Sequence, residues 1–207
     1  EDMDYADGLF TVAGTDRSMS LVDVARSAFM HAKLPPDLEG GLFETATFSP
    51  EADTFPNGAH VCEVEIDPET GQVNLVSYSV VDDVGTVINP MGLKGQIHGG
   101  IAQGLGQALM EQVVYDPDSG QILSGSFMDY TMPRADTTCA IQVESNPVPT
   151  KQNPLGAKGA GEAGTVGALP AVMNAVLDAL APLGVRDLDM PATSDRVWHA
   201  IQQAKTT

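Results

Sequence analysis

The sequence is poor in positive charge: its 207 residues include 10 Lys and Arg against 28 Asp and Glu, a formal net charge of −18. Proteins that bind nucleic acids or anionic membrane surfaces do so through clustered Lys and Arg side chains. The composition therefore argues against a nucleic-acid partner. The acidic residues are spread along the chain, which is typical of an ordinary solvated surface.

Cysteine and histidine are also scarce. The two cysteines, Cys62 and Cys139, are far apart in apolar stretches and lack the CxxC spacing of zinc and redox sites. The four histidines show neither HxH nor HxxxH spacing, so we expect no metal site built from protein ligands alone. We interpret both cysteines as buried thiols of a reducing compartment, and we expect a cytoplasmic protein.

Long hydrophobic runs are lacking as well, since no apolar stretch approaches the roughly 20 residues that span a bilayer. The first residues have neither the basic nor the apolar region of a signal peptide. We therefore expect no membrane span. The chain opens with EDMDYADGLF and without an initiator Met, so we expect it to continue from a preceding segment.

Apolar periodicity predicts a series of strands and helices. Hairpins are predicted around Asp7-Gly8, over 60–85, and over 113–135 with a turn at 117–120, followed by a strand over 139–147. Helices are predicted at 20–30 with Ser20 as N-cap, at 94–113, at 165–184 with Gly184 as its stop, and at 193–204. The interspersed order favours an α+β class with mostly antiparallel pairing. We treat 1–207 as one domain portion.

Glycine is concentrated in two places. The helix predicted at 94–113 contains glycines at 95, 99, 100, 104 and 106. Each mid-helix glycine costs about 1 kcal/mol relative to alanine. We therefore expect another helix or a ligand to approach this backbone closely.

The second glycine cluster, GAKGAGEAG at 156–164, has three possible explanations. It matches the GxGxxG fingerprint of dinucleotide sites, with Asp187 downstream, but three prolines in NPVPTKQNPLGAK exclude the strand that such a site requires. It could instead serve close helix packing. Packing does not explain Glu162, whose carboxylate on a bare backbone suits a general base that a ligand can reach.

Several ordered motifs together resemble one family. VVDDVGTVINPMGLKGQIHGGIAQGLGQALMEQ, FMDYTMPRA and NPLGAKGAGEAGTVGALPAVMNAV are similar to the C-terminal part of the molybdenum-binding large subunit of the xanthine oxidase family, of the aldehyde and carbon monoxide dehydrogenase type. DGLFTVAGTDRSMSLVDVA is similar to the segment that precedes these motifs. The resemblance covers nearly the whole chain and implies a molybdopterin-binding region of an incomplete large subunit.

The resemblance implies a site and an activity. Glu162 would be the general base of a molybdenum hydroxylase, an oxidoreductase that oxidises an aldehyde, an N-heterocycle or carbon monoxide with water as the oxygen source. The cofactor would be molybdopterin in its cytosine dinucleotide form. The residues implied to contact it are Gln96, Lys158, Gly159, Ala160 and Gly161.

The resemblance also implies partners. The remainder of the large subunit would complete the pocket, and further subunits would carry iron-sulfur clusters and FAD. We expect the isolated chain to be inactive for this reason. The alternative that we keep open is a freestanding, non-catalytic homologue that acts as a binding or assembly module.

Overall fold

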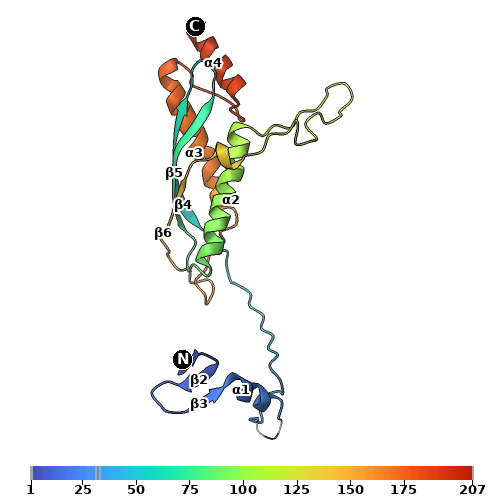
Figure 1. Ribbon diagram of the computed structural model, residues 1–207, viewed down its shortest axis with the longest axis vertical. Coiled ribbons are helices and arrows are strands. Elements are labelled where there is room, and N and C mark those ends of the chain that lie inside the picture. Colours follow the sequence, from blue (N-terminus) through green and yellow to red (C-terminus); the bar gives the residue numbers. More distant parts are fainter. Residues whose placement is uncertain (1, 31, 33, 207) are drawn as a thin grey trace. The chain divides into compact units, whose positions relative to one another are not determined.

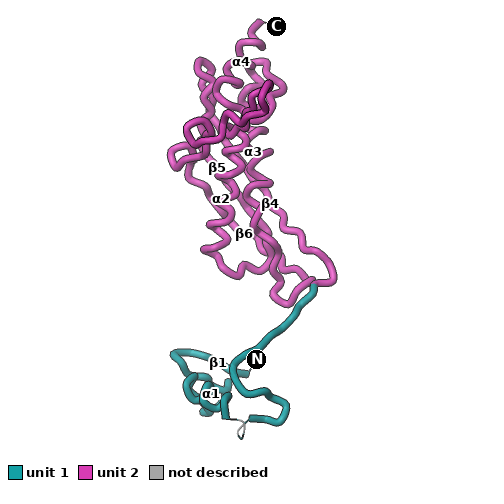
Figure 2. The backbone as a smooth tube through the Cα atoms, turned by 90° about the vertical axis from the view of Figure 1, so that its right-hand side faces the viewer, with its two compact units in different colours: residues 1–49 teal, residues 50–207 magenta. Residues whose placement is uncertain are grey.

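A computed structural model describes residues 2–30, 32 and 34–206 of the chain. The described chain divides into two compact units, residues 1–49 and residues 50–207 (Figure 2). The second unit contains the long helices and the larger sheet.

The first unit is a small antiparallel sheet followed by a short helix. Strands β1 (Met3–Ala6), β2 (Leu9–Val12) and β3 (Ser18–Ser20) pair in the order β1-β2-β3. Asp7 and Gly8 both have positive φ, 49° and 78°, as the two-residue turn of a tight hairpin requires. Helix α1 (Leu21–Ala28) begins where the Ser20 hydroxyl accepts a hydrogen bond from the Asp23 N–H, 3.1 Å away. The predicted hairpin and N-cap are confirmed.

The sheet of the second unit combines both kinds of strand pairing. Strands β4 (Asn57–Ile66) and β5 (Val73–Asp83) form the predicted antiparallel hairpin. Strand β6 (Ile141–Ser145) then pairs with β5 in parallel, so the order is β4-β5-β6. Along β4 and β5, alternate side chains face the interior, as a sheet with one covered face requires. The class is α+β, as expected.

Three helices accompany this sheet (Figure 1). Helix α2 (Pro90–Leu109) begins earlier than predicted, because Pro90 occupies its first turn and the Asn89 side chain accepts a hydrogen bond from the Gly92 N–H at 2.8 Å. Helix α3 (Ala163–Leu180) continues into η3 (Ala181–Leu183) and stops at Gly184, which has φ 89°. Helix α4 (Ser194–Thr206) ends the described chain.

Helices α2 and α3 pack against each other, and α3 also packs on β4. The two helices are in close contact at Gly104, where an added Cβ would lie only 2.6 Å from the Ala168 Cβ. At Gly100 a Cβ would lie 2.9 Å from the Thr165 nitrogen. The core is built from this helix pair and the inner face of the sheet, with Tyr78, Val80, Ile97, Ile101, Leu105, Val172, Val176 and Leu180 fully buried.

The third predicted hairpin, over 113–135, is confirmed only around its turn at 117–120. There the Asp116 N–H donates to the Gln121 carbonyl and the Leu123 N–H to the Val114 carbonyl, both at 2.8 Å, and Tyr115 and Ile122 form an isolated antiparallel bridge, but no strand is formed over 113–135. Residues 111–134 instead extend away from the helices and sheet as a long loop that leads to η2 (Ala135–Thr137) (Figure 1). Most of its side chains are exposed, so its alternating pattern has no core face to support a strand.

Helix α3 with η3, Ala163–Leu183, is the one helix among the described residues that is long and apolar enough to cross a membrane by length and composition. The same helix packs on α2 and β4 and places Ala168, Val172, Val176 and Leu180 in the core. A core helix of a globular domain passes the same test, so this feature carries no argument for a membrane span.

Candidate active site

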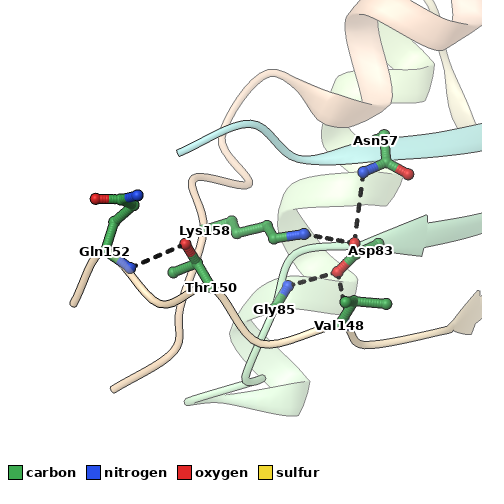
Figure 3. A network of polar contacts seen from close by, with 7 residues as sticks. All are labelled: Asn57, Asp83, Gly85, Val148, Thr150, Gln152 and Lys158. Carbon is green, nitrogen blue, oxygen red and sulfur yellow. Dashed lines mark hydrogen bonds and ion pairs between the residues drawn. The ribbon is translucent and has the colours of Figure 1, made fainter. Parts of the chain in front are cut away.

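The glycine-rich loop that precedes α3 is anchored by an ion pair (Figure 3). The Lys158 ammonium lies 2.5 Å from the Asp83 carboxylate at the end of β5, and their side chains are 11% and 10% exposed. The other oxygen of Asp83 accepts hydrogen bonds from the N–H groups of Gly85 and Val148, at 2.8 and 2.9 Å. The Asn57 amide on β4 also donates to this carboxylate, at 3.4 Å.

The loop backbone is tied to the same place. The Lys158 N–H donates to the Val84 carbonyl at 2.8 Å, and the Thr86 N–H donates to the Gly156 carbonyl at 2.9 Å. Gly156 has φ 70°, a conformation that side chains disfavour, and a Cβ there would lie 2.8 Å from the Thr86 hydroxyl. The hydrogen bond from Lys158, followed by those from Val148 and Gly85, lowers the pKa of Asp83. The carboxylate therefore stays ionised and holds the loop.

Glu162 ends this anchored loop. It occupies the N-cap position of α3, with φ −105° and ψ −3°, and its side chain makes no capping hydrogen bond. The side chain is exposed. A carboxylate here is favoured by the helix dipole, and it is free to meet a ligand rather than committed to the helix.

A cavity of about 470 Å³ lies beside Glu162. One wall is formed by the open end of the β4–β5 hairpin, and the other by the glycine loop and the first turns of α3. The strand wall contains Pro56, Asn57, Gly58, His60 and Asp82, and the other wall contains Gly159, Ala160, Gly161, Glu162, Ala163, Val166 and Gly167. This volume is within the range of sites for small molecules and cofactors. The lining is mostly glycine and small apolar residues with a few acidic and polar groups, so it offers shape and hydrogen-bond acceptors.

A buried polar pair forms part of the strand wall. His60 Nε2 lies 3.5 Å from Asp82 Oδ1, and the two side chains are 6% and 3% exposed. His60 Nδ1 lies 2.7 Å from the Tyr78 hydroxyl, which is also buried. Burial lowers the pKa of His60 and raises that of Asp82, while their mutual attraction opposes both shifts. Burial also raises the pKa of Tyr78, so its hydroxyl stays protonated.

The structure brings together some of the residues that the sequence singled out. Gly159, Ala160, Gly161 and Glu162 line the cavity, whereas the Lys158 side chain is engaged by Asp83. Gln96 lies on an exposed face of α2, and it is not among the residues that line the cavity. The cofactor contacts assigned to these residues remain predictions.

Sequence reasoning missed the polar pair on the strand wall. His60 was grouped with histidines that lack metal-ligand spacing, and Asp82 was not singled out. A signal was available, because in a hairpin with period-two alternation both residues fall on the apolar, inward side of their strands. A charged residue at an inward position marks a site that needs a partner.

A family model and several known proteins match most of the chain. The family model described as molybdopterin cofactor-binding domain matches residues 1–139. The carbon monoxide dehydrogenase large chain of Hydrogenophaga pseudoflava is 37% identical over 203 residues, which are 98% of this chain and 25% of that protein. The nicotine 6-hydroxylase large subunit of Paenarthrobacter nicotinovorans is 38% identical over 202 residues, 97% of this chain and 25% of that protein.

The fold is shared with a solved enzyme structure. The crystal structure of quinoline 2-oxidoreductase from Pseudomonas putida 86 superposes with a TM-score of 0.86 at 40% identity, over 98% of this chain and 26% of that one. The chain thus spans about a quarter of the length of the relatives that it matches. The family model ends before Glu162, but the alignments with these relatives extend over almost the whole chain.

Proposed function

The chain belongs to the molybdopterin cofactor-binding domain family, and from this premise we propose that it forms part of the cofactor and substrate site of a molybdenum hydroxylase. In this proposal Glu162 is the general base, and water supplies the oxygen that enters the substrate. The observation that carries the proposal is the position of Glu162, which lies uncommitted beside a 470 Å³ cavity at the end of a loop fixed by Lys158 and Asp83.

The residues around the cavity fit a pterin cofactor with phosphate groups. At Gly159 and Gly161 a Cβ would meet no atom of the described residues within 4 Å, apart from the adjacent residues, so the backbone is open to a ligand on that side. The first turn of α3, which begins at Ala163, lines the same cavity. Helix N-termini present unpaired N–H groups that suit phosphate. These features support a molybdopterin site, and we propose the cytosine dinucleotide form.

Each group of this chain has a distinct part in the proposed reaction. The bound cofactor would supply the centre that accepts electrons from the substrate. Glu162 would accept the proton of the attacking water, for which a general base commonly contributes about 10²–10⁴ in rate. Lys158 would act as a positioning residue, because its ion pair with Asp83 fixes the loop that presents Glu162. Gln96, Ala160 and the loop glycines are proposed as cofactor contacts.

The names of the relatives suggest the class of substrate and the partner subunits. The relatives carry the names carbon monoxide dehydrogenase, nicotine 6-hydroxylase and quinoline 2-oxidoreductase. We propose that the substrate of this protein is likewise a small molecule: an N-heterocycle, an aldehyde or carbon monoxide. We further propose that the enzyme is cytoplasmic and that it is completed by the rest of a large subunit and by subunits with iron-sulfur clusters and FAD. In the absence of these parts, this chain alone is inactive.

A non-catalytic binding or assembly module is the second candidate. The enzymes named above align with nearly the whole chain, including the loop with Glu162. An assembly module would not require an uncommitted carboxylate beside a cavity. The catalytic proposal is therefore better supported.

Replacing Gly161 with alanine tests the proposed cofactor site. Because a Cβ at this position has open space around it among the described residues, the Gly161→Ala protein is expected to unfold at the same urea concentration as the wild type. The added methyl group would occupy space that the cofactor needs, so the molybdenum and pterin content of the Gly161→Ala protein should fall. Unchanged molybdenum and pterin content with unchanged stability would contradict the site, as would a wild-type enzyme without molybdenum.

A further inference from the structure

Two consecutive aspartates at the end of β5 differ sharply in their hydrogen-bond partners. Asp83 is surrounded by donors, from the ammonium of Lys158 to the N–H groups of Gly85 and Val148. Asp82 faces the interior, and its Oδ2 is a buried atom that has no hydrogen-bond partner within the described part of the chain. Buried carboxylate oxygens are nearly always hydrogen-bonded in native proteins. The free oxygen of Asp82 therefore indicates a partner that is not part of this fold.

Two glycines make the space in which the Asp82 and His60 side chains lie. Gly58 is directly opposite Asp82 across the hairpin, and a Cβ at Gly58 would lie 1.9 Å from Asp82 Oδ1. On the helix side, a Cβ at Gly167 of α3 would lie 2.4 Å from the His60 ring. Any side chain at either position would displace the pair. Both glycines and both members of the pair line the cavity beside Glu162.

The hydrogen-bond chemistry of the pair leaves one acceptor of a cavity-lining residue without a partner. The protonated Tyr78 hydroxyl can donate to His60 Nδ1, at 2.7 Å. In a neutral imidazole the proton is then on Nε2, which faces Asp82 Oδ1 at 3.5 Å. In the ionised carboxylate, Asp82 Oδ2 is an acceptor only. No described residue donates a hydrogen bond to it, so an occupant of the cavity that Asp82 lines can supply the donor.

We propose that Asp82, oriented by His60, is a binding subsite that accepts a hydrogen bond from an amino or ring N–H group of a flat heterocycle in this cavity. The glycine-lined walls suit a planar ring, and a carboxylate accepts strongly from such a group. This chemistry has two possible sources, the pterin ring of the cofactor and an N-heterocyclic substrate. The identity of the occupant rests on the proposed function, whereas the binding chemistry does not.

The test compares two ring probes on the protein carrying this sequence, prepared in a host that makes no molybdopterin. The probes are 2-aminopyrimidine, which has an amino donor, and pyrimidine, which lacks it. Binding is measured by calorimetry and by the ring resonances of His60, assigned with a His60→Gln variant. A hydrogen bond to a charged group predicts that 2-aminopyrimidine binds roughly tenfold or more tightly than pyrimidine. This comparison on the wild type needs no variant to fold.

Variants then locate the preference. Asp82→Asn keeps the shape of the side chain but directs an amide N–H toward the cavity if its oxygen faces His60, so the preference for the amino probe should disappear. Glu144→Gln, on the exposed side of β6, removes a carboxylate from the same sheet and should leave the preference intact. Equal binding of both probes to the wild type would overturn the inference, as would an unchanged preference in Asp82→Asn.

The source is identified by repeating the measurement on protein that contains its cofactor. Loss of amino-probe binding in the loaded protein assigns the subsite to the pterin, and retained binding assigns it to the substrate. The result also separates the two proposals. A wild type that never acquires molybdenum contradicts the proposed function, but probe discrimination that depends on Asp82 would still support the subsite.

Discussion

Two glycines of α2, Gly99 and Gly104, are expected to respond to alanine with opposite effects on stability. At Gly99 a Cβ would meet no atom of another described segment within 4 Å, so Gly99→Ala only improves the helix. At Gly104 the Cβ would lie 2.6 Å from the buried Ala168 Cβ and 3.3 Å from the Thr165 carbonyl. Neither of these neighbours has a flexible end that could turn away, so α2 and α3 must move apart.

The magnitudes follow from two opposing effects. Replacing a mid-helix glycine with alanine stabilises a helix by about 1 kcal/mol, and both variants receive this gain. Overpacking a well-packed core costs about 1–3 kcal/mol, and only Gly104→Ala incurs it. The difference between the two variants in the free energy of unfolding is therefore about 1–3 kcal/mol, with Gly99→Ala above the wild type.

Urea unfolding followed by the fluorescence of Trp198, the single tryptophan, measures both variants in the second unit. Thermal unfolding gives an independent value, at about 2–4 °C per kcal/mol for a chain of this size. Equal stabilisation in both variants would refute the close contact of α2 and α3. A loss of stability in Gly99→Ala would show that another part of the protein covers that face.

Three further predictions concern the loop anchor, a helix cap and a thiol. Lys158→Met should lower stability at neutral pH more than Lys151→Met in the same loop, because Lys158 is the ion-pair partner of Asp83. The pKa of Asp83 is lowered from 3.8, so the stability that ionised Asp83 contributes is present above about pH 4 and is lost as the pH falls further. The urea midpoints of the wild type and Lys158→Met should therefore converge in acid, and a difference that does not change with pH would refute the ion pair. Asn89→Ala removes the N-cap of α2 and should cost about 1 kcal/mol in urea unfolding, and no loss would argue against the cap. Cys62 and Cys139 are half-buried rather than fully buried as predicted. This partial burial raises the pKa of Cys62 from 9.0 to about 11, so its alkylation at pH 8 should be on the order of 100-fold slower than in urea, and equal rates would contradict the burial.

The sequence was most informative where structure is set by near neighbours. The turn at Asp7-Gly8, the N-cap at Ser20 and the helix stop at Gly184 were each predicted from residues a few positions apart, and each is confirmed. The hairpin predicted over 60–85, from alternation that continues on both sides of one turn, forms over 57–83. Over 113–135 the same reasoning located the turn at 117–120 but predicted strands that do not form, because no core supports this loop.

Long-range partners could not be obtained from the same patterns. The parallel pairing of β6 with β5 joins segments that are separated by α2 and the long loop. The partners of Asp83 come from as far away as Lys158, 75 residues along the chain. Glycine spacing likewise did not distinguish Gly104, which packs against α3, from Gly99, which faces open space. The sequence motif places Glu162 at the end of a glycine loop, but the cavity beside it could not be predicted from the sequence.

Turnover of Glu162→Gln in the enzyme assembled with the rest of the large subunit and its partner subunits, at matched molybdenum content, tests the central claim most directly. The amide keeps the size of the side chain, and the carboxylate makes no capping hydrogen bond, so folding and metal content should be unchanged. We predict that substrate turnover per bound molybdenum falls by about 10²–10⁴, as expected when a general base is removed. Wild-type turnover in Glu162→Gln at equal molybdenum content would contradict the assignment of Glu162 as the base.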